Sequence, residues 1–327
     1  MTLPHPAVSV VVPVRNRRRM LRELLEALDR QTYRSFEVLV VDDGSEDGTA
    51  DVARDAVVAE RPVVSLRSDG QGTLRARQIG IDRATGPVLA FTDSDCVPDR
   101  GWLTHAMAAM DQGADMVHGH TRPTRALKPL ERSVEAGDEG LFPTCNILYR
   151  RELYETLGGF DAATAAAWRL GAVSRMRDSA FGEDTLLGWQ AVRSGADVRY
   201  VADAVVEHQV FAPQLGDFLL RTAKAAGFPA MIRDLPELRS RMVRGGVFLG
   251  GYRRVPVYLT LAALLLRRRR IALGAMAWWT SARVLDLRAG PYPTAKMLPW
   301  LPAEMAADVA TAAALSLGSA RARTPIL

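Results

Sequence analysis

The chain has 327 residues, of which 48% are hydrophobic and 24% are charged. Such a composition can bury a sizeable core, so it excludes a disordered protein and predicts one large domain or one domain with an appendage. The net charge of +5 and the isoelectric point near 9.5 would suit nucleic acid, acidic lipid or a phosphorylated metabolite as a partner. The abundance of arginine and alanine favours the alternative that the charge reflects a GC-rich genome.

Cysteine usage and the N-terminus both favour the cytoplasm. Cys96 and Cys145 are the only cysteines, too few for a disulfide framework and without the spacing of a metal site, which predicts a reducing compartment. Residues 1–7 carry no basic region followed by a long apolar run, so we expect no secretory signal.

Short apolar runs alternate with segments of helical periodicity from residue 8 onward. The alternation predicts βαβ units and a mainly parallel sheet with helices on both faces. The elements expected in the first half are a strand at 8–12, a helix at 17–30, a strand at 36–41, a helix at 49–60, a strand at 63–66, a helix at 73–84 and a strand at 87–91.

The second half is more mixed, and the alternation stops at about residue 212. We therefore predict an α/β domain at residues 1–212 and a helical, basic and apolar extension at residues 213–327. The elements expected before the boundary are a helix at 102–110, strands at 115–118 and 144–149, a helix at 151–157 ended by Gly158 and Gly159, a helix at 185–193 and a strand at 198–201.

The extension contains an apolar run at residues 255–266 followed by four arginines at 267–270. A spanning helix needs roughly 20 apolar residues, so we expect no membrane span. Two interpretations remain open. One is peripheral membrane contact, with Trp278 and Trp279 at headgroup depth and the arginines on anionic lipid, and the other is a helical extension packed on the catalytic domain.

Polar clusters follow the predicted strands at the ends where open parallel sheets collect their ligands. Arg15 follows the first strand, Asp42 and Asp43 the second, and Asp93 and Asp95 the fourth. On a turn after a strand, two such carboxylates could converge on one Mg²⁺ or Mn²⁺ ion and, through it, on a diphosphate. The alternative is an aspartate-rich turn in which Asp99 caps the helix that starts near Trp102.

Six motifs in one order carry a resemblance to a known family. Over about residues 7–210 the chain closely resembles the family 2 glycosyltransferases of the GT-A fold, a Rossmann-like α/β fold whose members move a sugar from a nucleotide diphosphate donor with inversion. The motifs are "VSVVVPVRNR", "VLVVDDGSEDGT", "GTLRARQIG", "FTDSDCVPD", "GGFD" at Gly158 to Asp161 and "FGEDTLLGWQAVRSG" from Phe181.

The resemblance implies a donor site at the strand ends. Pro13, Arg15 and Asp43 would contact the base, and Asp43 would accept a hydrogen bond from a uracil-like imide. Arg77 would lie beside the base or the diphosphate, although Gln78 stands where the family commonly has asparagine. Asp93 is expected near the ribose. The implied donor is a UDP- or dTDP-sugar.

The resemblance also implies the catalytic groups. Asp95 and His208 would bind a divalent cation, Mn²⁺ or Mg²⁺, and Asp184 would take the proton from the acceptor hydroxyl. Glu183, which we place among the substrate-binding residues, would help to raise the pKa of Asp184. The alternative for Glu183 and Asp184 is that they are acidic residues in a first helical turn, favourable to the helix dipole.

The segment at residues 162–180 is longer than the corresponding connection in relatives, and it is interpreted either as a lid or as a surface insertion. Cys145 lies where relatives line the acceptor pocket and is expected to be a wall residue, not a nucleophile.

The expected acceptor is a carbohydrate or a lipid-linked molecule used in cell-envelope or other glycoconjugate synthesis. The alternatives are an inactive nucleotide-sugar binder or scaffold, and a nucleic-acid-binding protein. We expect no nucleic acid partner, because the basic runs adjoin apolar stretches and form no recognised binding module.

Overall fold

The computed structural model describes residues 5–161, 163, 168, 181–214, 221–222 and 224–327. The chain forms two compact units. The described residues of the first fall in Met1–Thr124, Ser133–Ala166 and Arg177–Gln209, and those of the second in Arg125–Arg132, Ala167–Met176 and Val210–Leu327.

The first unit is built on an eight-stranded mixed sheet with the order β5-β2-β1-β6-β9-β8-β10-β7. Strands β5, β2, β1 and β6 run parallel, β9 is antiparallel to β6 and β8, and β10 pairs parallel with β8 and antiparallel with β7. The strands are β1 (Val8–Val14), β2 (Phe36–Asp42), β5 (Val64–Arg67), β6 (Val88–Phe91), β7 (Cys96–Pro98), β8 (Met116–Pro123), β9 (Ile147–Arg150) and β10 (Val198–His208).

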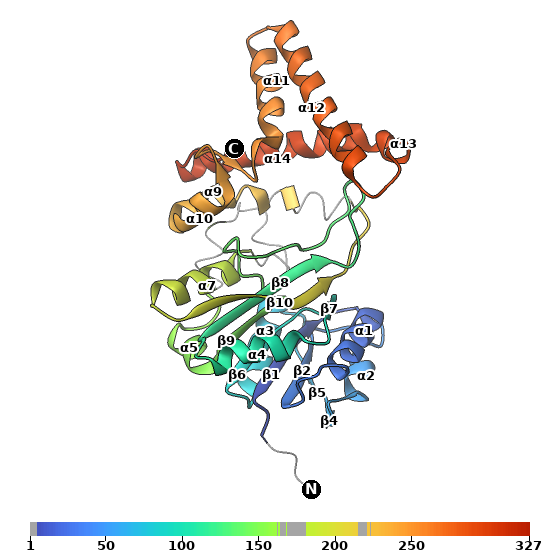
Figure 1. Cartoon of the computed structure of the whole chain (residues 1–327), viewed down its shortest axis with the longest axis vertical. Coiled ribbons are helices and arrows are strands. Elements are labelled where there is room, and N and C mark those ends of the chain that lie inside the picture. Colours follow the sequence, from blue (N-terminus) through green and yellow to red (C-terminus); the bar gives the residue numbers. More distant parts are fainter. Residues whose placement is uncertain (1–4, 162, 164–167, 169–180, 215–220, 223) are drawn as a thin grey trace. The chain divides into compact units, whose positions relative to one another are not determined.

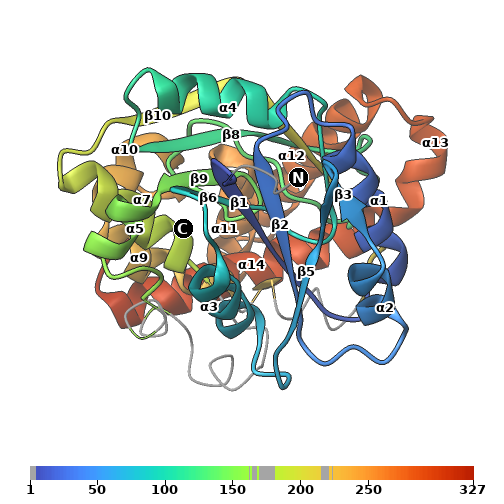
Figure 2. The ribbon, with the colours of Figure 1, turned by 90° about the horizontal axis from the view of Figure 1, so that it is seen from below.

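Helices cover both faces of this sheet, and Figure 2 shows α3 on one side and α4 on the other. Because side chains alternate along a strand, Val10 and Val12 of β1 pack in the core with residues of α1 and α4. Val11 points the other way, toward Gly80 of α3. The helices are α1 (Arg18–Asp29), α2 (Thr49–Arg54), α3 (Thr73–Arg83), α4 (Trp102–Asp111), α5 (Arg151–Thr156) and α7 (Glu183–Arg193).

The predicted helix at 49–60 is wrong in its second half. Helix α2 ends at Arg54, and the short strands β3 (Val57–Val58) and β4 (Arg61–Pro62) form an antiparallel hairpin. Ala59 and Glu60 make its turn with φ of 50° and 63°. Positive φ at both central residues suits a two-residue hairpin turn and ends any helix.

Two strands reach well beyond the ends that the sequence pattern indicates, and the edge strand next to one of them was not expected. β8 extends to Pro123 and β10 to His208, while β7 was not predicted at all. The ladder between β10 and β7 places His208 opposite Cys96. It therefore draws the end of β10 to the aspartates that follow β6.

The second unit is mainly helical (Figure 1). Its small core joins Val257 of α11 and Trp279 of α12 to Ala312 of α14. No helix among the described residues is both long enough and apolar enough to cross a membrane. The elements are α9 (Phe228–Asp234), α10 (Glu237–Met242), β11 (Val243–Arg244), β12 (Phe248–Leu249), η2 (Tyr252–Arg254), α11 (Val255–Leu265), α12 (Arg269–Ala289), α13 (Thr294–Met297), η3 (Leu298–Trp300) and α14 (Leu301–Ala322).

Candidate active site

The polar residues singled out in the sequence follow strands that end at one edge of the sheet. Val14 of β1 lies level with Asp42 of β2, and Asp42 lies level with Arg67 of β5. The pairing of β1 with β6 ends at Val11 and Phe91, just before the turn that contains Asp93 and Asp95. The carboxyl ends of β1, β2 and β6 therefore gather these turns along the same edge.

Asp43 is buried and held rigidly at the end of β2. The Ser68 hydroxyl donates to its Oδ1, and the Gly72 amide donates to Oδ2 at 3.0 Å. Asp42 instead closes its own turn, because its two oxygens accept the Ser45 amide. A carboxylate has more acceptor positions than Asp43 uses here, so it keeps capacity for a donor group of a ligand.

Two of the predicted base contacts, one in β1 and one directly after it, differ in exposure. Pro13 is buried and Arg15 is exposed. The β1 ladder with β2 continues to Val14, whereas the ladder with β6 stops at Val11. Pro13 therefore sits in the strand beyond the last β6 pairing, where its missing N–H breaks no bond of that ladder.

Asp93 is paired with a buried arginine from α3. Arg77 donates from Nη2 to Asp93 Oδ1 at 2.8 Å, while its neighbour Arg75 is exposed. Burial lowers the pKa of Arg77, but the charge and hydrogen bond of Asp93, with the charges of Glu183 and Asp184, raise it above its ordinary value. Arg77 is thus a permanent cation placed among three carboxylates.

Asp95 belongs to a second cluster. His208 Nε2 lies 3.5 Å from Asp95 Oδ2, and Arg17 forms an ion pair with the same oxygen. Cys96 completes a group of three buried residues whose ligand atoms lie within 4.8 Å of one another. Burial, followed by contact with Cys145, raises the pKa of the Cys96 thiol well above its usual value, which favours the carboxylate and the imidazole as ligands.

His208 is oriented toward Asp95 by its other ring nitrogen. Nδ1 lies 2.9 Å from the Gln209 carbonyl oxygen, which can only accept, so Nδ1 carries the hydrogen. Ser133 lies 3.2 Å from Nδ1 and donates to the His208 carbonyl at 2.9 Å. Nε2 faces the Asp95 carboxylate at 3.5 Å, so with Nδ1 on a backbone carbonyl it is the ring nitrogen available to a metal ion, the arrangement that metal-binding histidines adopt.

In this structure Asp93 and Asp95 do not share a partner, and their convergence on one ion stays a prediction. Asp93 faces Arg77, whereas Asp95 faces His208 and Arg17. The Cys96 amide donates to the Asp93 carbonyl at 3.0 Å, so a tight turn separates the two side chains. Asp99 does not cap α4 either, because Gly101 is the N-cap residue and makes no side-chain cap bond.

Glu183 and Asp184 occupy the first turn of α7, as the helix-dipole alternative also predicts. The Thr185 amide donates to Asp184 Oδ1 at 2.8 Å, and the Thr144 amide donates to Oδ2 at 3.2 Å. Burial, and then the charge of Glu183, raise the pKa of Asp184 to about 7, although these amides and Arg77 act in the opposite direction. A carboxyl group with this pKa exchanges protons near neutrality, which a structural cap does not require.

Among the described residues, the buried atoms of this site without a hydrogen-bond partner include the hydroxyl group of Tyr149 and Oε2 of Glu183. Burial, followed by the charge of Asp184, raises the pKa of the Tyr149 hydroxyl well above its usual value. Buried polar atoms normally find partners, so these two favour a site that receives a polar ligand.

Sequence reasoning missed several contributors. Arg17 pairs with Asp95, Ser133 bonds His208, and the Thr144 amide holds Asp184. Arg17 ends the motif "VSVVVPVRNR", but the motif assigns it no role, because each of these residues acts through a partner far along the chain. Asn146, the neighbour of Cys145, is held by hydrogen bonds with Trp102, His120 and Ala204.

The expected lid at residues 162–180 lies outside the described residues, except for Ala163 and Trp168. Trp168 is buried, and its indole nitrogen donates to Asp234 Oδ2 at 2.8 Å. Cys145 is buried too and its sulfur lies 3.8 Å from the Thr121 hydroxyl; its role in the wall of an acceptor pocket stays a prediction.

Comparisons with known proteins agree on the family and the fold. The family model for glycosyl transferase family 2 matches residues 9–130. Glycosyltransferase AglE of Haloferax volcanii is 31% identical over 49% of this chain and 58% of its own length. Pre-mycofactocin glycosyltransferase of Mycobacterium tuberculosis is 28% identical over 75% of this chain and 52% of its own. The chain thus spans little more than half of these relatives.

Among solved structures, the mannosyltransferase PcManGT from Pyrobaculum calidifontis, in complex with GDP-Man and Mn²⁺, is 20% identical with a TM-score of 0.56. The match covers 98% of this chain and 88% of that one. The likeness confirms the predicted fold class, an α/β GT-A sheet flanked by helices with a helical C-terminal region.

Proposed function

We propose that this chain, whose residues 9–130 belong to glycosyl transferase family 2, is an inverting glycosyltransferase that moves a sugar from a nucleotide diphosphate to an acceptor hydroxyl. The observation that carries the proposal is the grouping of a carboxyl group of raised pKa, a buried arginine and an aspartate–histidine pair around the turns at one sheet edge. These groups serve proton transfer, diphosphate binding and cation binding, the three tasks of such a reaction.

The donor binds along the ends of β1, β2 and β6 in this proposal. Pro13, Arg15 and Asp43 contact the base, and Arg77 and Asp93 contact the diphosphate and the ribose. Asp43 is suited to its role because two donors hold both of its oxygens in place. We propose a UDP- or dTDP-sugar, and the GDP-Man bound to the Pyrobaculum enzyme makes guanosine the base to test beside them.

Asp184 acts as the general base. Inversion needs one in-line displacement: the acceptor oxygen bonds to the anomeric carbon while the bond from that carbon to the diphosphate oxygen breaks. The acceptor proton passes to the Asp184 carboxylate, and the bonding electrons leave with the diphosphate. A pKa of about 7 suits this step, because the group is ionised in a useful fraction and still basic enough to accept the proton.

Asp95 and His208 are the proposed ligands of Mn²⁺ or Mg²⁺. Their oxygen and nitrogen atoms lie 3.5 Å apart, close enough to share one ion, and His208 presents Nε2. The ion, when bound, supplies Lewis-acid stabilisation of the leaving diphosphate. Arg17 balances the charge of Asp95 in the present structure and has to release that oxygen when the ion binds.

The proposed acceptor is a carbohydrate or a lipid-linked molecule, used in the synthesis of the cell envelope or another glycoconjugate. We place the enzyme in the cytoplasm at the inner face of the membrane, in peripheral contact through its C-terminal extension. The support is the combination of apolar runs and arginine clusters in that extension.

The test is nucleotide diphosphate release from a panel of UDP-, dTDP- and GDP-sugars, with and without Mn²⁺ or Mg²⁺, in the presence of candidate acceptors. We expect release with one base class, stimulated by the cation. Donor affinity is measured in parallel by calorimetry. Binding without release from any donor would instead support the inactive nucleotide-sugar binder.

A further inference from the structure

Helices α11 and α12 form a hairpin whose base is anchored within the second unit (Figure 1). Trp279 packs against α14, and its indole nitrogen donates to Asp308 Oδ2 at 3.0 Å. Arg283 donates twice to Glu304, at 2.8 and 3.2 Å. These buried contacts fix the lower part of the hairpin, so its shape does not depend on anything that covers the upper part.

In the upper part of the hairpin, small side chains are buried and large apolar side chains are exposed, which is the opposite of the usual packing of helices in water. Its buried positions are alanines, Ala263, Ala272 and Ala275. The large apolar side chains point outward, with Leu265 85% and Leu273 70% exposed. In water, an amphipathic helix turns its leucines toward its partner, whereas close packing through small residues is typical of helices surrounded by lipid.

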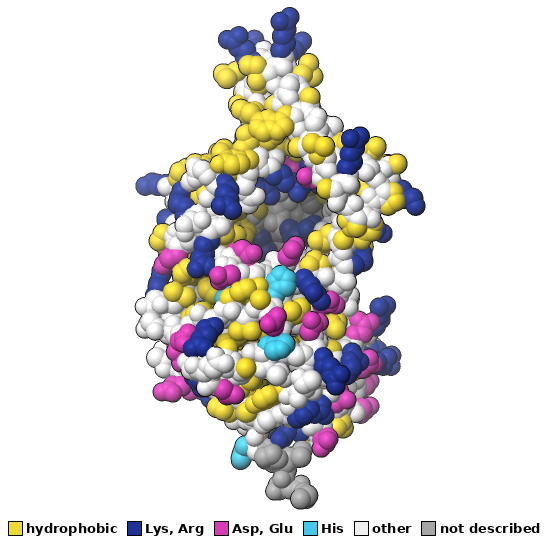
Figure 3. Space-filling model, in the orientation of Figure 1, with side chains coloured by type: hydrophobic (Ala, Val, Ile, Leu, Met, Phe, Trp, Pro, Cys, Tyr) yellow, Lys and Arg dark blue, Asp and Glu magenta, His cyan; other side chains and the backbone are white. Residues whose placement is uncertain are grey.

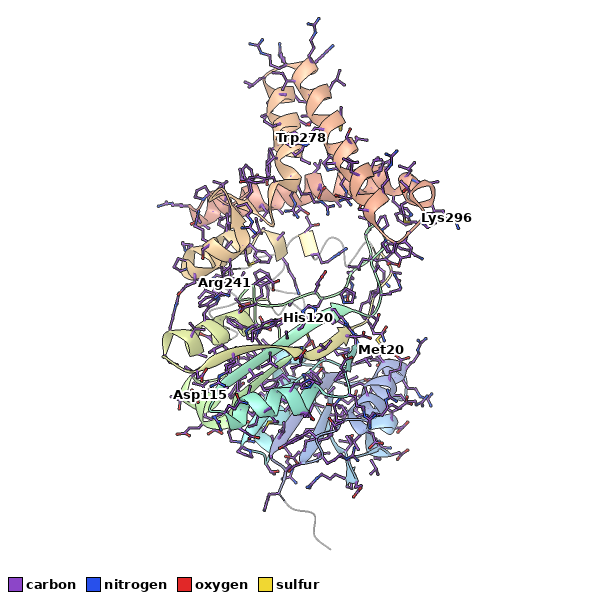
Figure 4. The ribbon with its side chains drawn as sticks, viewed as in Figure 1. Met20, Asp115, His120, Arg241, Trp278 and Lys296 are labelled. Carbon is purple, nitrogen blue, oxygen red and sulfur yellow. The ribbon has the colours of Figure 1, made fainter. Side chains whose placement is uncertain are left out.

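The outward apolar surface covers both helices. Ile271, Trp278 and Leu285 are seven residues apart on α12 and therefore lie on one face of it, and Figure 4 shows Trp278 on the stem. The exposed apolar residues of the hairpin are Leu259, Leu261, Leu264, Leu265, Leu266, Ile271, Leu273, Met276, Trp278 and Leu285. Isolated exposed leucines are ordinary, but a continuous set of this kind marks an interaction surface.

The turn of the hairpin carries the positive charge. Residues 267–270 are all arginine and all exposed, and Figure 3 shows them as dark blue side chains at the tip above an apolar stem. Residues 255–285 contain no aspartate or glutamate. The surface therefore requires a partner that offers negative charge beside an apolar phase.

We propose that the α11–α12 hairpin docks on an anionic lipid bilayer. The leucines enter the boundary between headgroups and acyl chains, and Arg267–Arg270 bind lipid phosphates. The hairpin lies along the interface, because guanidinium groups at its tip must stay at phosphate level. A second copy of the chain is a poorer partner, since its hairpin would bring more arginines and no carboxylate from residues 255–285.

This inference rests on the proposed membrane contact and assigns it to the α11–α12 hairpin. It is tested by an experiment that does not depend on sugar transfer. Full-length protein is sedimented with vesicles of phosphatidylcholine, with and without phosphatidylglycerol. We expect binding to the anionic vesicles only. A Leu265→Ser/Leu273→Ser variant should bind about tenfold more weakly. In the Arg267→Gln/Arg268→Gln/Arg270→Gln variant, the affinity for anionic vesicles should fall by about fivefold for each arginine replaced.

Two matched variants in the first unit serve as controls. Val57→Ser removes an apolar side chain that is 61% exposed. Arg19→Gln/Arg34→Gln/Arg54→Gln removes the same net charge from exposed positions. Both should bind vesicles like the parent protein. If the hairpin and control variants lost the same vesicle affinity, binding would depend on net charge alone, and the proposal would be overturned.

Insertion is measured separately with a dye. Cys96 and Cys145 are buried, so a Leu265→Cys variant accepts an environment-sensitive thiol label selectively. Anionic vesicles should shift its emission to the blue, and a label at Val57→Cys should not respond. Absence of vesicle binding would overturn the proposal. If the hairpin variants changed only the molar mass in light scattering, the hairpin would instead be a contact between two copies of the chain. Nucleotide diphosphate release with a water-soluble acceptor tests the enzyme independently.

Discussion

Asp184 is the residue on which the proposed chemistry depends. Two backbone amides hold its oxygens, yet burial and the charge of Glu183 raise its pKa to about 7. The two amides favour the ionised form and burial favours the neutral form, so the carboxyl group is poised between them. Its neighbours should therefore control activity through that balance.

Replacing Asp184 by asparagine should abolish transfer but keep the donor site. We expect kcat to fall by about 10²- to 10⁴-fold because the proton acceptor is lost. Donor affinity by calorimetry should stay within about threefold, since Asp184 is assigned to the acceptor side. The parent enzyme should lose activity as the pH falls through about 7, where the base becomes protonated. Unchanged turnover in Asp184→Asn would remove the residue from the mechanism.

Glu183 and Arg77 should move the acid limb of the pH profile in opposite directions. The charge of Glu183 raises the pKa of Asp184 and that of Arg77 lowers it. In Glu183→Gln the pKa of Asp184 falls and the limb of kcat/KM moves to lower pH, whereas in Arg77→Gln it moves to higher pH. Arg75→Gln, an exposed change two positions from Arg77, should leave the profile in place. Shifts of the same sign would contradict the electrostatic account.

At the scale of elements, the site depends on how closely helix α3 lies on the sheet. A Cβ atom on Gly80 would stand 2.6 Å from a methyl group of Val11 and 3.2 Å from one of Val41. The glycine thus lets the helix that carries Arg77 approach the strands β1 and β2. A helix held further out would carry Arg77 away from Asp93.

Two glycine-to-alanine changes in helices should have opposite effects on stability. Gly80→Ala should lower the free energy of unfolding by about 1–3 kcal/mol, because the clash with Val11 outweighs the gain in helix propensity. Gly274→Ala in α12 meets nothing within 4 Å and should raise it by about 0.5–1 kcal/mol. Denaturant unfolding measures both. A stabilising Gly80→Ala would show that α3 can shift without cost.

At the scale of the whole molecule, the proposed cation site exists only because distant segments meet. Asp95 follows β6 and His208 ends β10, and the β7–β10 ladder brings them together. Such a site has no local precursor in an unfolded chain. Binding of the ion should therefore stabilise the folded state as a whole.

Manganese should raise the melting temperature of the protein. At about one hundred times its Kd, a ligand bound only to the folded state contributes about 2.7 kcal/mol, so we expect a rise of several degrees. Asp95→Ala and His208→Ala should abolish the shift, and a chelator should reverse it. His105→Ala, which changes an exposed histidine, is the control. A full shift in both site variants would place the cation elsewhere.

Much of the fold was predictable from local patterns. The apolar run that begins at Val8 and the helical periodicity around Leu21 and Leu24 report the immediate environment of each segment, and β1 and α1 appear where expected. The helix expected at 49–60 failed because Ala59 and Glu60 take positive φ in a hairpin. The hairpin forms because the two short strands pair with each other, and the spacing of apolar residues along the chain carries no information about that pairing.

The sequence by itself determined the order of strands and helices, the placement of polar turns after strands and the match of residues 9–130 to the model of glycosyl transferase family 2, because periodicity and motif order are properties of neighbouring residues. Only the tertiary structure gave Asp93 and Asp95 different partners, joined Asp95 to His208, raised the pKa of Asp184 and turned the leucines of the α11–α12 hairpin outward. Burial, charge proximity and strand pairing arise between residues far apart in the chain, so no local pattern carries them.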